Sequence, residues 1–382
     1  MVKASVDFRK DSLDEISNLV KLRLNVKGKV TTFEKLNGGY SGTNYLVIID
    51  STPETKYVLK ICNGYTISDV EQQTLAMSYL FNHGFELCCH PIPLVIPSVD
   101  SIYTSLTDDN QPCILLSYIN GYAGDYLVEN GLLSAIDVVR QLGRGLSRMH
   151  SIPYDNTLAL RSYKDSGACD AHKHIQGLYK SQFLSTHDIY IKTHPYVAFY
   201  LAHCDQMATD LNSDLPICII HGDPFMDNAL LNEVSGELTG FVDFEDACTG
   251  PRLFDLVCCI VGNCFDSDNV LSLELVDSLL AGYITTTTGT TTATTAHTGT
   301  SQINSAVAVP HVSLNAREYA LFVPFMRYLL ICNATFRFWN FNINHIDQRE
   351  VSMCIPYTVS YILYFTYAHI ICGICVHLNI YR

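Results

Sequence analysis

The chain has 382 residues, of which 48% are hydrophobic and 16% are charged. This length and composition allow a sizeable buried core in two lobes or domains, which excludes a wholly disordered protein. The 38 acidic and 24 basic side chains give a net charge of −14. Broad binding to nucleic acid requires clustered positive charge, so no nucleic-acid partner is expected.

Fifteen cysteines raise the question of disulfides, and the sequence argues against them. Residues 1–10 contain no apolar segment of the kind found in secretory signals. The number of cysteines is odd, and the neighbours Cys88 and Cys89, like Cys258 and Cys259, lie in apolar runs. We therefore expect buried thiols in a cytoplasmic protein.

Residues 1–120 predict a β-rich lobe with one helix. The helix is expected after an N-cap at Ser68 or Asp69, because apolar residues then recur at helical spacing. Four strands are predicted from short apolar runs bounded by turn residues, at 30–36, 43–49, 56–62 and 112–119.

Residues 121–350 have a mainly helical pattern, and Asn120-Gly121 marks the boundary as a turn. The clearest helical segments are 132–150, 196–211 and 314–341. Eleven of the sixteen residues from Thr285 to Thr300 are threonine, so no apolar face exists there. We therefore expect a disordered insertion over 285–301.

The C-terminal tail, residues 351–382, is unusually apolar. Residues 354–376 carry no formal charge and are long enough to cross a bilayer. The tyrosines of this segment are spread along it, whereas a membrane belt gathers aromatic residues at both ends. Membrane contact through the tail is thus one alternative, and a buried terminal segment or a tail outside the working protein is favoured.

The residues that point to chemistry lie in two polar loops that follow short apolar runs. Asp223 and Asn228 lie in the first loop, and Asp243 ends the second apolar run fifteen residues later. Phosphoryl transfer from a nucleotide needs one carboxylate to deprotonate the attacking hydroxyl, and a carboxamide with a second carboxylate to hold Mg²⁺. Asp223, Asn228 and Asp243 fit these three roles in that order.

The order and spacing of residues 221–228 and 242–244 resemble the aminoglycoside phosphotransferase and choline kinase superfamily. The resemblance implies an α+β, two-lobed protein-kinase-like fold with a small β-rich N-lobe and a larger, mainly helical C-lobe. It implies ATP and Mg²⁺ as cofactors, Asp223 as the catalytic base, and Asn228 and Asp243 as metal ligands. His221 and Asp255 would then support the catalytic loop by hydrogen bonds.

The same resemblance assigns the nucleotide site to the N-lobe. Gly38, Gly39 and Gly42 lie between two predicted strands, where their backbone could approach phosphate oxygens. Lys60, on the third strand, would contact the α- and β-phosphates, and Glu71 in the following helix would pair with it.

Residues 115–119 resemble the hinge between the lobes. The hinge backbone, represented by Ser117 and Ile119, would hydrogen-bond adenine.

Three segments are similar to the kinase-like homoserine kinase branch of the superfamily: 41–47, 243–256 and 337–339. This implies that L-homoserine is phosphorylated to O-phospho-L-homoserine for threonine biosynthesis. Two features depart from the branch, which often lacks a lysine at the position of Lys60 and usually ends in polar sequence.

Homoserine would bring a carboxylate and an ammonium group. Arg337 is the candidate for the carboxylate, since guanidinium binds carboxylate bidentately, and Glu245 or Asp246 could face the ammonium. The alternatives are a choline, ethanolamine, hydroxylysine or aminoglycoside kinase, and an inactive nucleotide-binding interaction protein. The oligomeric state stays open.

Overall fold

The computed structural model describes residues 20, 28–36, 42–51, 53–97, 101–154, 156, 158–163, 179–210, 214–266, 270–284 and 313–342. Gly38, Gly39, the threonine-rich segment and the apolar tail, all singled out above, lie outside these residues. Within the described part of the chain, none of the helices has the length and apolar character needed to span a membrane.

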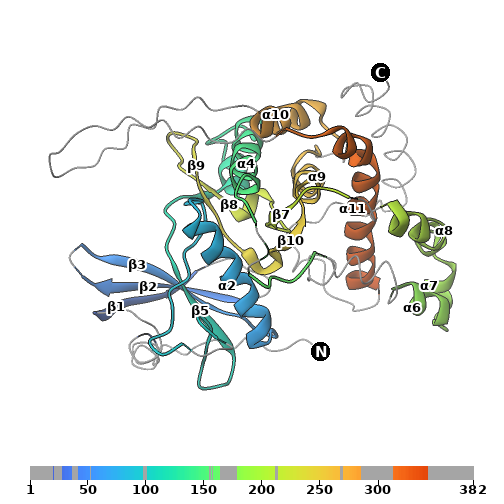
Figure 1. The fold of residues 1–382 in the computed structure, drawn as a ribbon. Helices are drawn as coiled ribbons and strands as arrows, with labels where there is room; N and C mark the ends of the chain where they lie inside the picture. Colours follow the sequence, from blue (N-terminus) through green and yellow to red (C-terminus); the bar gives the residue numbers. More distant parts are fainter. Residues whose placement is uncertain are drawn as a thin grey trace.

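The N-lobe is built on an antiparallel sheet of five strands in the order β1-β2-β3-β5-β4 (Figure 1). Buried residues alternate along β2, so that Tyr45, Val47 and Ile49 face a small core on one side of the sheet. Four strands lie within two residues of the predicted bounds: β1 (Lys29–Lys35), β2 (Thr43–Asp50), β3 (Thr55–Ile61) and β5 (Pro112–Ser117). The short β4 (Ser105–Leu106) was not predicted.

Helix α2 (Ile67–Asn82) connects the N-lobe sheet to the rest of the molecule. It begins earlier than predicted, because Thr66 caps it and exchanges hydrogen bonds with Asp69, the third residue of the helix, in a capping box. The assignment of the N-cap to Ser68 or Asp69 was therefore wrong. Buried residues such as Met77 and Leu80 pack into the large core shared with the C-lobe.

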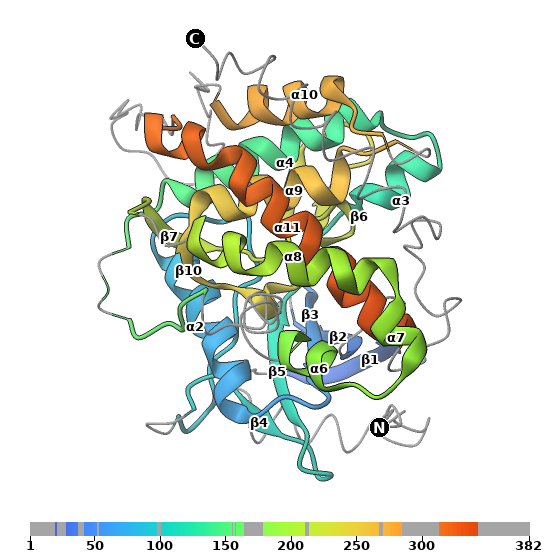
Figure 2. The ribbon, with the colours of Figure 1, turned by 90° about the vertical axis from the view of Figure 1, so that its right-hand side faces the viewer.

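The C-lobe is mainly helical, and its most extensive helix–helix packing is between α4 and α10 (Figure 2). The helices approach closely because Gly143 and Gly282 lack side chains. A Cβ at either position would lie 2.1 Å from a backbone carbonyl of the other helix. The helices are α3 (Gly124–Glu129), α4 (Ala135–His150), α6 (Tyr179–Ser185), α7 (Ile189–Thr193), α8 (Pro195–Asp210), α9 (Arg252–Asn263), α10 (Leu273–Ile284) and α11 (Ala316–Asn342).

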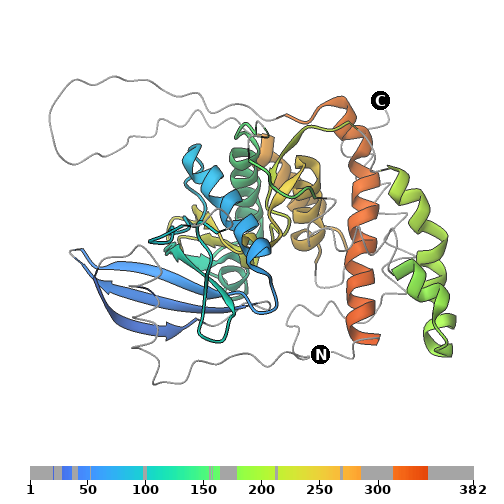
Figure 3. The same cartoon turned by 60° about the horizontal axis from the view of Figure 1, so that its bottom comes forward.

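Two small sheets carry the polar loops of the C-lobe. They are β10 (Cys248–Pro251) paired with β7 (Ile217–Ile220), and β6 (Tyr122–Ala123) paired with β8 (Ala229–Leu231) and then β9 (Leu238–Phe241). The N-lobe sheet lies at one end of the molecule and α8 and α11 at the other, with α2 between them (Figures 1 and 3). The predicted α+β architecture with a small β-rich lobe and a larger helical lobe is confirmed.

The cysteines of the described residues are consistent with the expectation from sequence. Ten of them are buried and form no disulfide there. Burial raises the pKa of seven of these thiols, and the pKa of both Cys62 and Cys89 reaches about 12. These thiols are therefore packing groups that stay protonated at neutral pH.

Candidate active site

Two loops of the C-lobe bring the predicted catalytic and metal-binding side chains together. The first loop runs from β7 to β8 and contains Asp223 and the 3-10 turn η3 (Met226–Asn228). The second loop follows β9 and contains Asp243, just before the 3-10 turn η4 (Phe244–Asp246). Antiparallel pairing of β8 with β9 aligns the two loops, and the N–H of Val242 donates to the carbonyl of Asn228 at 2.9 Å.

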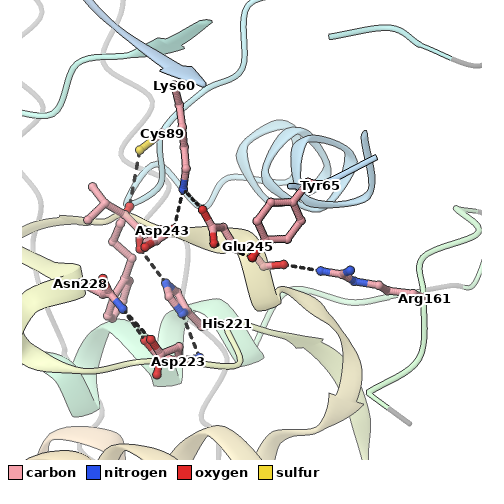
Figure 4. A network of polar contacts seen from close by, with 11 residues as sticks. Lys60, Tyr65, Cys89, Arg161, His221, Asp223, Asn228, Asp243 and Glu245 are labelled. Carbon is pink, nitrogen blue, oxygen red and sulfur yellow. Dashed lines mark hydrogen bonds and ion pairs between the residues drawn. The ribbon is translucent and has the colours of Figure 1, made fainter. Parts of the chain in front are cut away.

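The carboxylate of Asp223 is fixed by the carboxamide of Asn228. Nδ2 of Asn228 donates to the backbone carbonyl of Asp223 at 2.9 Å and to its Oδ2 at 3.0 Å. Figure 4 shows the side chain of Asn228 directed at Asp223, and Asp243 contacted by Lys60. Because Asn228 uses its donor atoms on Asp223, its Oδ1 is the atom suited to a metal ion.

Close backbone contacts hold the two loops next to each other. Gly222 has a φ of +90°, and a Cβ there would lie 2.6 Å from the carbonyl oxygen of Asp246. Asp243 has φ 62° and ψ 61°, in the left-handed region that non-glycine residues rarely adopt. A strained conformation at this position is typical of a functional residue held by its surroundings.

Asp255, in the first turn of α9, accepts hydrogen bonds from the backbone of the catalytic loop. Its carboxylate receives the N–H of His221 at 2.7 Å and the N–H of Gly222 at 2.8 Å. Nε2 of His150 lies 3.1 Å from the same carboxylate, and Nδ1 of His150 lies 2.9 Å from the hydroxyl of Tyr283. Asp255 thus makes the contacts expected of a residue that supports the loop, and His150 is a partner that the sequence did not indicate.

The imidazole of His221 joins the two loops from within. Its Nε2 lies 2.9 Å from the carbonyl oxygen of Val242, and its Nδ1 accepts the N–H of Asp223 at 3.3 Å. Burial lowers the pKa of His221, which favours the neutral ring. A neutral imidazole that donates through Nε2 and accepts through Nδ1 fits a bracing role.

Lys60 reaches from β3 to the second loop of the C-lobe (Figure 4). Its Nζ lies 2.6 Å from Oδ1 of Asp243 and 2.5 Å from Oε1 of Glu245. Burial of Lys60 disfavours the charge, but the two carboxylates outweigh burial and keep the pKa of the ammonium above its ordinary value. Burial likewise favours neutral Asp243, and Lys60 reverses this and lowers the pKa of that carboxyl.

The predicted pair of Lys60 with Glu71 does not form. The Glu71 carboxylate instead accepts the backbone N–H groups of residues 102–104, together with the hydroxyl of Thr104 at 2.7 Å. These bonds tie α2 to the chain before β4 and occupy both carboxylate oxygens of Glu71. Assigning Glu71 to Lys60 was therefore wrong, and Glu245 takes that place.

The proposed contact of Glu245 with a substrate ammonium is also not what the structure shows. Its Oε1 is taken by Lys60, and its Oε2 accepts the hydroxyl of Tyr65 at 2.9 Å. The guanidinium of Arg161 donates to the backbone carbonyl of Glu245 (Figure 4). Tyr65 and Arg161 were missed, since neither belongs to a periodic pattern or a motif of the sequence.

The other predicted residues have mixed outcomes. Gly42 fits its role, because a Cβ there would lie 2.6 Å from the carbonyl of Ile61 and 3.6 Å from Cε of Lys60. Ser117 exchanges hydrogen bonds with the backbone of His90 through its N–H and hydroxyl, so an adenine contact by those groups is not supported. The predicted adenine contact of Ile119 and the predicted carboxylate contact of Arg337 stay predictions. Ile119 packs against Gly240, and the side chain of Arg337 lies outside the described residues.

The carboxylates around Asp223 suit a divalent cation with phosphate oxygens. Burial, together with the negative charges of Asp246, Asp227 and Asp243, raises the pKa of Asp223 to about 8. No set of three or more His, Cys, Asp or Glu side chains in the described ranges could hold a metal by itself. Magnesium is commonly held by one or two protein oxygens plus phosphates, so Asn228 and Asp243 fit this ion.

The raised pKa of Asp223 predicts a specific pH dependence of stability. The ordinary value is 3.8, and the folded value is about 8, so between them the folded protein holds a proton that the unfolded chain has lost. The resulting stabilisation is complete below about pH 4 and is lost as the pH rises through 8. Asp223→Asn removes this dependence. Its Tm relative to wild type should therefore rise between about pH 5 and pH 8.5 in metal-free buffer, and a constant difference would contradict the raised pKa.

Comparison with known proteins gives one family. Residues 32–293 match the family model described as the phosphotransferase enzyme family. A homoserine kinase from Methylobacterium radiotolerans is 39% identical over 70 residues, which cover 18% of this chain and 21% of that protein. A homoserine kinase from Phenylobacterium zucineum is 23% identical over 258 residues, which cover 67% of this chain and 71% of that protein. The chain thus aligns with about a fifth of the first relative's length.

Solved structures share the fold. An amicoumacin kinase bound to AMP-PNP and Ca²⁺ aligns with a TM-score of 0.58 at 13% identity, covering 91% of each chain. An ethanolamine kinase from Plasmodium vivax aligns with a TM-score of 0.53 at 13% identity, covering 81% of this chain and 76% of that one. At such identities the likeness shows the fold alone, and the predicted kinase-like fold is confirmed.

Proposed function

The chain belongs to the phosphotransferase enzyme family, and from this premise we propose that it transfers the γ-phosphoryl group of ATP to the hydroxyl of L-homoserine. The product would be O-phospho-L-homoserine, made in the cytoplasm for threonine biosynthesis. The observation that carries the proposal is the convergence of Asp223, Asn228 and Asp243 beside a buried lysine. Residues 1–120 would form the nucleotide-binding lobe and residues 121–350 the catalytic and substrate-binding lobe.

Each residue has a defined part in the proposed reaction. Asp223 accepts the proton of the acceptor hydroxyl, whose oxygen forms a bond to the γ-phosphorus while the bond from that phosphorus to ADP breaks. Lys60 contacts the nucleotide phosphates, and Asn228 and Asp243 would hold Mg²⁺. The bound ion would neutralise phosphate charge in the transition state.

The acceptor is proposed to be an amino alcohol on electrostatic grounds. Asp227 and Asp246 lie close enough to Asp223 to raise its pKa by their negative charge. An acidic surrounding favours a substrate that carries an ammonium group near the reacting hydroxyl. Asp246 remains our candidate for that ammonium, and Arg337 on α11 our candidate for the carboxylate of homoserine.

The same acidic surrounding suits a second candidate function, phosphorylation of ethanolamine, choline, hydroxylysine or an aminoglycoside. These acceptors share a cationic nitrogen with homoserine, and choline and ethanolamine lack its carboxylate. A basic residue for that carboxylate is thus the feature that separates homoserine from choline and ethanolamine as acceptors. Arg337→Met should weaken homoserine as a substrate far more than ethanolamine if the first candidate is right.

The test is a panel of acceptors with the full-length chain, ATP and Mg²⁺. ADP release is measured together with the mass of the phosphorylated product for homoserine, ethanolamine, choline, hydroxylysine and an aminoglycoside. We expect the highest kcat/KM for homoserine. A higher value for another acceptor would replace the narrow assignment. Absence of any acceptor-dependent turnover in protein that binds ATP would favour the inactive interaction protein.

A further inference from the structure

Lys60 is a buried cation with two carboxylate partners. Its side chain is 8% exposed, and both Asp243 and Glu245 lie within 2.6 Å of its Nζ. Two carboxyl groups thus contact a single ammonium group. One carboxylate therefore suffices to neutralise Lys60, and the other is in excess.

The two carboxylates differ in how firmly they are held. The Glu245 side chain is 10% exposed, and Tyr65 binds its second oxygen while Arg161 binds its backbone carbonyl. Turn η4, which carries Glu245, also packs against α2. The Asp243 side chain is 32% exposed and lies beside Asn228 and Asp223 (Figure 4). Asp243 is thus the partner that Lys60 can lose, and Glu245 is the partner that stays.

We propose that Glu245 is a positioning residue that holds Lys60 while Asp243 is transferred from Lys60 to the metal ion. The inference rests on the proposed function, which gives Asp243 to Mg²⁺ and Lys60 to the nucleotide phosphates. Lys60 and the metal compete for the same carboxylate of Asp243. Glu245 weakens that competition because it offers Lys60 a second partner at almost the same distance.

The two rival roles of Glu245 make different predictions about Lys60. As a metal ligand, or as a negative charge that attracts cations, Glu245 would favour metal binding whether or not Lys60 is present. As a positioning residue, Glu245 acts only through Lys60. The coupling between the two side chains therefore separates the roles, and a double-mutant cycle measures it.

The experiment measures the affinity of the full-length chain for Mn²⁺ by the EPR signal of the free ion, with and without AMP-PNP. The proteins are wild type, Glu245→Gln, Lys60→Gln and the double variant, each checked for folding by its Tm. Glu245→Gln should weaken Mn²⁺ binding about tenfold in the wild-type background and by less than about twofold in the Lys60→Gln background. Lys60→Gln should strengthen binding of Mn²⁺ alone, because Mn²⁺ then has no competitor for the Asp243 carboxylate.

Two further variants keep the result interpretable. Glu245→Asp retains the carboxylate and should restore Mn²⁺ affinity at least in part, which a loss caused by misfolding would not show. Glu237→Gln neutralises an exposed acid before β9 and should leave Mn²⁺ affinity unchanged.

An equal effect of Glu245→Gln in both backgrounds, or an effect in neither, would overturn the positioning role. Failure of wild type to bind Mn²⁺ with AMP-PNP would overturn the proposed function itself and the inference with it. Wild-type binding without coupling between Lys60 and Glu245 would leave the proposed function standing and reject the inference alone.

Discussion

Replacing Asp223 with asparagine is expected to lower kcat by about 10²- to 10⁴-fold while changing the affinity for ATP little. The carboxamide keeps the size of the side chain but cannot accept the proton of the attacking hydroxyl. Asn228 would still lie against the loop through the backbone carbonyl of Asp223, to which it donates at 2.9 Å. The measurements are acceptor-dependent ADP release and calorimetric binding of AMP-PNP.

Asp227→Asn is the matched control for this variant. Asp227 lies four residues further along the same loop, in η3, and burial raises its pKa to about 6. Asp227→Asn replaces a neighbouring carboxyl group with a carboxamide, as Asp223→Asn does, but removes no proposed catalytic group. We expect less than a tenfold loss of kcat. Similar losses in both variants would show that loop charge, and not proton transfer, accounts for the effect.

Replacing Asp255 with alanine is expected to destabilise the folded chain by about 3 to 5 kcal/mol. The side chain is fully buried, and its loss would leave the N–H groups of His221 and Gly222 without their acceptor. Loss of these bonds would also release the loop that holds Asp223, so kcat should fall. Urea unfolding with the m-value checked against wild type measures the first effect.

Glu274→Ala is the control for Asp255→Ala, because both acids lie in the first turn of a C-lobe helix. Glu274 is exposed, so its contribution is confined to the favourable interaction with the helix dipole. We expect a change within about 0.5 kcal/mol. If both variants lose similar stability, the hydrogen bonds of Asp255 would not be the cause.

Local patterns predicted the elements of this fold well, and they predicted side-chain pairing poorly. The four predicted N-lobe strands and the three predicted C-lobe helices, at 132–150, 196–211 and 314–341, lie within three residues of the predicted bounds, because apolar periodicity reflects burial directly. The cap of α2 was misplaced by two to three residues, since Thr66, Ser68 and Asp69 are all good N-cap residues and only the reciprocal bonds single out Thr66.

The active-site residues divide in the same way. Asp223, Asn228 and Asp243 were found because a fixed spacing within short loops determines which side chains can meet. Glu245 was not predicted as the partner of Lys60, because it lies 185 positions later in the chain. Only the packing of η4 against α2 brings the two side chains together. The partners of Glu71 are backbone N–H groups. Every residue except proline carries such a group, so no sequence pattern indicates which of them Glu71 binds.

The buried thiols of the core allow local opening of the structure to be measured at natural cysteine residues. A thiol that stays protonated and shielded reacts with a maleimide only after the surrounding helices separate. Cys62 directly follows β3, and Cys258 and Cys259 lie in α9. Their individual alkylation rates, followed by peptide mass, would map which lobe opens first without introducing any probe.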